Sequence, residues 1–441
     1  MSQGEAGSYG RGARLLSIGI ASTGLVTFSY FSLASYVLDE VAYKQVALLW
    51  SVMFVIVSVL YRPIEQLLSR TIADRRARGV AGPLPLRTPL ALQGSFALAF
   101  LAIAVVFKEQ LVDDVFDGES SLYWILVAGV LFYAASYFAR GWLAGHQMFG
   151  LYGGLVFMEA CSRFLFALAV AVGIASGQTA VALGMAAAPL VSLVVVPWAF
   201  GKRFERGAAA SGAGPAGDRK PDPEDLALSR GGRFAFAVVA VMAAEQTLLN
   251  AAVLTVDATS DDEAVAGFVF NVLLIARAPL QLFQAIQGSL LPHLAGLQAT
   301  GEGAAEFRKA IRITVLAIAA FAGAVALGLV VAGPFAMDLL FDDSFTYGRW
   351  GLALVALGMG AHLIAGTLNQ AALARDHAWS AAFAWLAVAA MFVVWMVVGV
   401  VDDQLLRAEV GYFGASALLC GLLTVVYLRP PGVDEAQQRQ H

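Results

Sequence analysis

Long apolar stretches recur along the whole chain, and they limit what it can fold into more than any other feature. A helix needs about 20 mainly apolar residues to cross the hydrocarbon core of a bilayer. Such stretches occur twelve times, near residues 14–38, 45–61, 88–107, 121–139, 151–175, 179–200, 234–256, 264–288, 313–336, 350–372, 378–401 and 409–428. The sequence therefore predicts an all-α, polytopic membrane protein with about twelve transmembrane helices.

Composition excludes the other broad classes of protein. Of the 441 residues, 59% are apolar and only 14% are charged, whereas soluble domains carry about 25% charged residues. The formal net charge of −4 and the lack of a sustained basic block exclude a nucleic-acid binder. The sequence contains no glycine-rich phosphate loop, zinc-type histidine spacing or nucleophile elbow. We therefore expect a protein that is not an enzyme and that needs neither a cofactor nor a metal.

The distribution of basic residues predicts the orientation of the chain. Of the 28 Lys and Arg residues, 22 lie in the connections on the side of the two termini, and four lie in the opposite connections, namely Lys44, Lys108, Arg349 and Arg407. Cytoplasmic loops attract Lys and Arg. We therefore expect a multi-pass protein of the cell membrane with both termini in the cytoplasm.

One connection divides the chain into two similar halves. Residues 205–232 are rich in Gly, Ala and Pro, which is typical of a flexible linker. They separate a predicted six-helix bundle at 1–204 from a second at 233–441. The segment from Arg62 is echoed by the segment from Arg277, at the equivalent place in the second half. The echo favours two parallel repeats with a central cavity between them, where transporter substrates bind.

Four ionisable residues fall inside the predicted spans: Glu159, Arg163, Glu245 and Arg277. Charged side chains are costly at the bilayer centre, so each is a candidate functional residue. Glu159 and Arg163 are four residues apart and share a helix face. They form either a structural ion pair or a site in which Arg163 holds an anion and Glu159 orients it.

Polar residues accompany the other two ionisable groups. Glu245 lies in a polar cluster that ends at Asn250, and an unpaired carboxyl there could take up and release a proton; pairing with Arg277 is the competing interpretation. Arg277, Gln281 and Gln284 share one helical stripe. A polar stripe on a membrane helix faces protein or water rather than lipid.

Three segments carry a resemblance to a known family. They are Arg62-Pro63-Ile64-Glu65-Gln66, then Ala139-Arg140-Gly141-Trp142-Leu143-Ala144-Gly145-His146, and then Glu159-Ala160-Cys161-Ser162-Arg163. The sequence resembles the polysaccharide-biosynthesis flippases, the O-antigen-flippase-like branch of the multidrug/oligosaccharidyl-lipid/polysaccharide exporter superfamily. The resemblance implies two six-helix bundles that move an undecaprenyl-diphosphate-linked oligosaccharide from the inner to the outer leaflet, generally in exchange for a cation.

The resemblance and the residue chemistry suggest a division of roles. Arginines suit the diphosphate of such a cargo, and amide side chains suit its sugar hydroxyls. Glu245, with Glu159, is the candidate for binding the coupling ion. Substrate, membrane lipid and neighbouring glycosyltransferases or a glycan polymerase are the expected partners. The candidate substrate-binding residues are Arg163, Arg277, Arg62, Gln281, Gln284 and Asn250.

Several alternatives stay open at this point. A lipid II flippase and a multidrug exporter of the same superfamily share the predicted architecture. A major-facilitator transporter also has six helices in each half, but its Gly-x-x-x-Asp-Arg-x-Gly-Arg loop is matched poorly, since Arg70 and Ala77 stand where both glycines belong. A membrane-bound polymerase would need a large outer loop, and the outer loops here are short.

Overall fold

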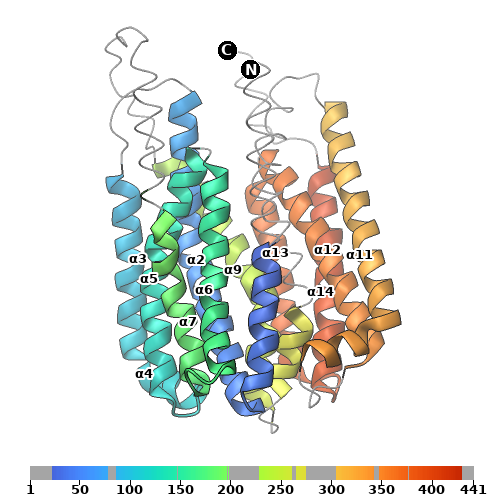
Figure 1. The fold of residues 1–441 in the computed structure, drawn as a ribbon. Helices are drawn as coiled ribbons and strands as arrows, with labels where there is room; N and C mark the ends of the chain where they lie inside the picture. The colour runs from blue at the N-terminus through green and yellow to red at the C-terminus, as the bar shows by residue number, and fades with distance from the viewer. Residues whose placement is uncertain are drawn as a thin grey trace, which may run out of the picture. The chain divides into compact units, whose positions relative to one another are not determined.

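The computed structural model describes residues 22–77, 86–146, 148–195, 197, 228–260, 265–274, 304–341, 347–375 and 377–429, and every regular element within these ranges is helical (Figure 1). Each of the twelve predicted spans overlaps one long or medium helix. These are the helix over residues 22–37, α2 (Glu40–Ala77), α3 (Arg87–Val106), α5 (Ser120–Gly145), α6 (Phe149–Ala171), α7 (Gly177–Ser192), α9 (Leu228–Thr259), the helix Val265–Leu274, α11 (Ala304–Leu340), α12 (Arg349–Ala374), α13 (Ala378–Val398) and α14 (Gln404–Leu428).

Short helical turns complete the described part of the chain. They are α4 (Lys108–Gln110), the π-helical turn Leu111–Val115 and the 3₁₀ turn Leu193–Val195. Among the described residues, nine helices are long and apolar enough to cross a membrane. The predicted all-α, multi-pass membrane architecture is confirmed.

Helix α2 continues well past the predicted end of the second span at residue 61. It passes through Pro63 and ends at Ala77, although proline removes a backbone hydrogen bond from a helix interior. Packing explains the extension: Leu68 and Ile72 are buried in a cluster with Trp142, Leu143, Met148 and Leu155. The short span predicted here was wrong, because a hydropathy window stops at Arg62 while the helix continues along its neighbours.

The chain divides into two compact units. The first comprises Met1–Tyr30 and Val52–Phe236, and the second comprises Phe31–Ser51 and Ala237–His441. Helix α2 therefore contributes its first part to the second unit and the rest to the first. Most of the predicted linker, 205–232, lies outside the described residues, and the predicted boundaries at 204 and 233 stay a prediction.

Several specific contacts hold residues 31–51 within the second unit. The Tyr36 hydroxyl donates to the carbonyl oxygens of Asp338 (3.3 Å) and Leu339 (3.0 Å) at the end of α11. The Lys44 ammonium lies 3.4 Å from the Asp257 carboxylate at the end of α9. Lys44 is only 5% exposed, so it forms part of the interior of this unit and not of the solvated connection that the sequence predicted.

Candidate functional site

The segments that carry the sequence resemblance converge in the first unit. Gly141 of α5 lies directly against α2: a Cβ atom on it would be 2.8 Å from the Glu65 carbonyl oxygen. Arg140 and Glu159 form an ion pair between α5 and α6. Three stretches far apart in sequence therefore meet around one group of buried and partly buried polar side chains, which we call the unit 1 polar cluster: Glu65, Tyr133, Ser136, Arg140, Tyr152, Glu159, Arg163 and Ser192.

Glu159 is the best-satisfied member of the unit 1 polar cluster. Its side chain is 2% exposed, and its Oε2 accepts a hydrogen bond from Arg140. Its Oε1 accepts from Ser136 and, at 3.4 Å, from Ser192 of α7. The spacing of the sequence suggested Arg163 as the partner of Glu159, but the structure gives this ion pair to Arg140. A partner on a neighbouring helix can approach more directly than one on the next turn of the same helix.

Arg163 lies one turn beyond Glu159 on α6 and is 4% exposed. Its Nη1 donates a hydrogen bond of 2.8 Å to the Tyr133 hydroxyl, and its guanidinium lies 5.8 Å from the centre of the Phe54 ring. Both of these contacts are with neutral groups, so neither cancels the positive charge. The structure therefore places the Arg163 guanidinium inside the first unit, not against lipid.

The C-terminal part of α2 adds a second carboxylate. Glu65 Oε1 accepts a hydrogen bond of 2.7 Å from the Tyr152 hydroxyl on α6. Arg62, a predicted substrate-binding residue, lies one turn earlier on α2 and is partly buried.

Arg140 was predicted to lie in a connection, because the fourth span was expected to end at residue 139. That placement was wrong: α5 continues to Gly145, and the Arg140 guanidinium packs over the Tyr137 ring at 4.4 Å.

We predict that Glu159→Gln lowers the free energy of unfolding by about 3–5 kcal/mol, because it leaves the buried Arg140 guanidinium without its carboxylate. Unfolding in mixed detergent micelles measures this loss. The double variant with Arg140→Met should recover most of the stability, since it removes the stranded charge. Equal stability of Glu159→Gln and the wild type would show that this ion pair does not stabilise the first unit.

The second unit contains a separate carboxyl–imidazole pair. Glu245 of α9 and His362 of α12 are both buried, and Glu245 Oε1 lies 3.8 Å from His362 Nε2. The His362 ring is flanked by Trp385, with ring centres 5.4 Å apart, and by Tyr412, at 6.2 Å. The sequence did not pair Glu245 with His362; the partner that it suggested for Glu245 was Arg277, which lies outside the described residues. We call these two side chains the Glu245–His362 pair.

Of the other predicted site residues of the second half, the structure describes Asn250. The Asn250 amide is buried and donates to the Gln246 carbonyl oxygen, 2.9 Å away on the same helix. Arg277, Gln281 and Gln284 lie outside the described residues. Their predicted roles in substrate binding stay predictions.

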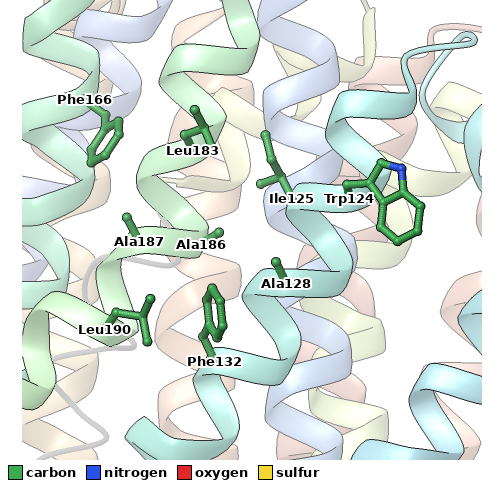
Figure 2. A pocket seen from close by; sticks show the side chains of 9 residues that line it. All are labelled: Trp124, Ile125, Ala128, Phe132, Phe166, Leu183, Ala186, Ala187 and Leu190. Carbon is green, nitrogen blue, oxygen red and sulfur yellow. The ribbon is translucent and has the colours of Figure 1, made fainter.

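A surface groove of the first unit is apolar. It is a groove of about 360 Å³ between α5, α6 and α7, and Figure 2 shows that hydrocarbon and aromatic side chains line it. Its lining residues are Trp124, Ile125, Ala128, Phe132, Phe166, Leu183, Ala186, Ala187 and Leu190. Such a lining suits contact with lipid chains and offers no charge to a diphosphate. No group of three or more metal-ligating side chains occurs among the described residues.

Comparison with known proteins identifies the fold. No family model and no curated protein matches the sequence. Among solved structures, the eukaryotic MATE transporter AtDTX14 superposes with a TM-score of 0.70 at 12% identity, covering 98% of each chain. An outward-facing multidrug resistance MATE family transporter of the MOP superfamily gives 0.65 at 15% identity, covering 95% of this chain and 94% of that one. The Vibrio cholerae MATE transporter VcmN in the bent form gives 0.57 at 12% identity, covering 99% of each.

These comparisons define the class of fold. The chain has the fold of the MATE transporters, which belong to the superfamily that the sequence resemblance indicated. The solved neighbours are transporters and not enzymes. At this level of sequence identity the likeness concerns the fold alone.

Proposed function

We propose that this chain is a transporter that moves polyprenyl-diphosphate-linked oligosaccharides from the cytoplasmic to the outer leaflet for the assembly of a cell-surface glycan. The observation that carries the proposal is the charge inside the first unit. Among its described residues, the charged side chains that are at most 9% exposed are Arg140, Glu159 and Arg163. Their formal sum is positive, because one carboxylate accompanies two guanidinium groups, and the partly buried Arg62 and Glu65 add one charge of each sign.

A positive interior suits an anionic cargo. Guanidinium groups bind phosphate oxygens through paired, charge-assisted hydrogen bonds. Arg140 donates to Glu159, and Arg163 donates to the Tyr133 phenol and lies over the Phe54 ring. A diphosphate could replace the phenol as the acceptor. Arg163 is therefore our first candidate for binding the head group, with Arg62 nearer the cytoplasmic surface.

The Glu245–His362 pair supplies a means of coupling transport to a proton gradient. A carboxyl and an imidazole 3.8 Å apart lie within ion-pair distance but beyond hydrogen-bond distance, so a small approach of the two side chains would let a proton pass between them. Transfer of a proton changes the net charge of the buried pair, and burial makes that charge costly. Uptake and release of one proton would then favour different conformations of the transporter, which is the requirement for alternating access.

A multidrug exporter is the second candidate, and the solved neighbours favour it, since two are described as multidrug resistance transporters. Many drugs are cations, and a cationic cargo would be repelled by the interior charge of the first unit. The same fold can serve different cargoes, because specificity depends on the site and not on the fold. The buried arginines therefore favour the lipid-linked cargo.

Reconstitution of the purified chain in liposomes separates the two candidates. A fluorescent polyprenyl-diphosphate oligosaccharide should cross the bilayer faster with the protein than without it, and a cationic dye should not. Accelerated movement of the dye alone would identify a drug exporter and contradict the proposed function.

A further inference from the structure

A groove between α13 and α14 in the second unit combines apolar walls with a positive charge. Its volume is about 350 Å³. On each helix the lining residues recur three or four positions apart and therefore form one stripe. They are Ser380, Phe383 and Ala384 of α13, and Leu422, Val425, Val426 and Arg429 along and directly after α14. No charged residue lines the groove of the first unit, whereas this one has a guanidinium in its wall.

The polar end of this groove lies at the ends of both helices. Ser380 lies in the first turn of α13, and Arg429 follows the last residue of α14. Trp379 and Tyr427 lie close to them in the sequence, and these two residue types are enriched where a membrane helix meets water. By the predicted orientation, this end faces the cytoplasm. A molecule in the groove would therefore place its polar part at the level of the inner head groups and its apolar part deeper in the membrane.

Basic residues gather at this end of the second unit. The Arg375 guanidinium donates to the Tyr427 carbonyl oxygen and lies 5.4 Å from the centre of the Tyr427 ring. The same ring stacks with Phe307, with ring centres 6.4 Å apart, so the beginning of α11 lies beside the end of α14. Three exposed basic residues follow Phe307 on α11, namely Arg308, Lys309 and Arg312.

Acidic residues are fewer in the same region. Over residues 304–312, 371–380 and 422–429, the sequence has five basic residues and two acidic ones, Glu306 and Asp376. The side chains of both acidic residues lie outside the described set. Positive charge at the cytoplasmic surface of a membrane attracts anionic lipids, so this end of the unit favours an anionic ligand.

Arg429 is the basic residue of the groove itself. It is exposed, and its guanidinium has no hydrogen-bond or ion-pair partner among the described residues. The Arg375 guanidinium, in contrast, is already held by the carbonyl oxygen and the ring of Tyr427. The donors of Arg429 are therefore open to a ligand that enters the groove.

We propose that this groove binds one anionic glycerophospholipid of the cytoplasmic leaflet. Its phosphodiester would accept hydrogen bonds from the Arg429 guanidinium and the Ser380 hydroxyl, since charge-assisted bonds between guanidinium and phosphate are strong. One of its acyl chains would lie along Phe383 and Leu422. The inference is independent of the cargo proposed above.

The charge of the head group decides which lipid the groove selects. Apolar walls alone bind any acyl chain. Phosphatidylethanolamine carries the same phosphodiester, but its ammonium group would lie in a region of positive charge. Phosphatidylglycerol carries no such group, and each basic side chain near the membrane surface strengthens its attraction. The groove therefore favours a lipid with a net negative head group.

Native mass spectrometry of the full-length protein in detergent measures this preference. The protein is titrated separately with phosphatidylglycerol and with phosphatidylethanolamine that carry the same acyl chains. We expect the first phosphatidylglycerol to bind about 5-fold more tightly, and Arg429→Ala to remove most of that difference, because one basic side chain contributes about this factor. Arg429→Lys keeps the charge and should retain most of the preference. Arg349→Ala, which removes an exposed arginine at the start of α12, should bind both lipids as the wild type does.

A second variant tests the apolar part of the groove. Ala384 is 9% exposed, and Ala384→Phe would fill space between α13 and α14 without changing any charge. Its affinity for both lipids should fall, and wild-type affinity would contradict the proposed position of the acyl chain. Equal affinity of the wild type for the two lipids, or an unchanged preference in Arg429→Ala, would overturn the inference. Equally tight binding of soluble glycerol 3-phosphate, which has no acyl chain, would show an anion site and not a lipid site.

Discussion

Replacing Arg163 with alanine should abolish transport of the diphosphate-linked cargo while leaving the protein inserted in the membrane. Removing one partner of a buried, hydrogen-bonded charge pair costs roughly 2–5 kcal/mol, which corresponds to about 30-fold to several thousand-fold in rate or affinity. Losing the contacts of Arg163 with Tyr133 and Phe54 should cost less stability than Glu159→Gln, which breaks a buried ion pair. Flipping of the fluorescent lipid-linked oligosaccharide in liposomes measures the effect.

Two matched variants identify the cause of that loss. Arg163→Lys keeps the charge but loses the planar fork of donors, so we expect transport between those of the wild type and Arg163→Ala. Tyr133→Phe removes the phenol hydroxyl and leaves the guanidinium, so transport should stay within a few-fold of the wild type. If Arg163→Ala moves the cargo at the wild-type rate, Arg163 does not bind the head group.

Replacing Glu245 with glutamine should uncouple transport from the proton gradient. Glutamine has nearly the same shape but cannot bind a proton, so the acceleration produced by a proton gradient should fall by about 100-fold. Exchange of cargo between the two leaflets without a gradient should persist, because it needs no net proton movement. Binding of the cargo should change less than turnover.

The design of the Glu245 experiment separates coupling from general damage. Rates are compared with and without a proton gradient in the same liposomes, for the wild type, Glu245→Gln and the exposed-carboxyl control Glu109→Gln. Equal rates of the wild type and Glu245→Gln at all pH values and gradients would contradict proton coupling through this residue.

The fold was predictable because a membrane imposes a simple rule on sequence. Spanning helices must be apolar and about 20 residues long, so the windows located each long helix in the described part of the chain. Helix ends were less predictable. Packing of Leu68 and Ile72 extends α2 through Pro63. A hydropathy average over consecutive residues contains no information on contacts with residues that are distant in sequence.

The candidate site was predictable only in part. Glu159, Arg163 and Glu245 were evident because a charge inside an apolar span requires an explanation. Their partners Arg140, Tyr133 and His362 lie on other helices. The spacing of residues along one helix does not determine which residues of a neighbouring helix they face. Arg140 was missed because it lies at the edge of an apolar window, where charge is expected. A requirement that every buried charge has a counter-charge would have directed attention to Arg140.

The most direct test of the central proposal is the location of lipid-linked oligosaccharide in cells that lack this protein. If the chain flips this cargo, its deletion should trap the oligosaccharide on the cytoplasmic leaflet and remove the corresponding surface glycan. Wild-type protein should restore both, and Arg163→Ala should restore neither. Normal surface glycan in the deletion strain, with no cargo retained on the cytoplasmic side, would contradict the account.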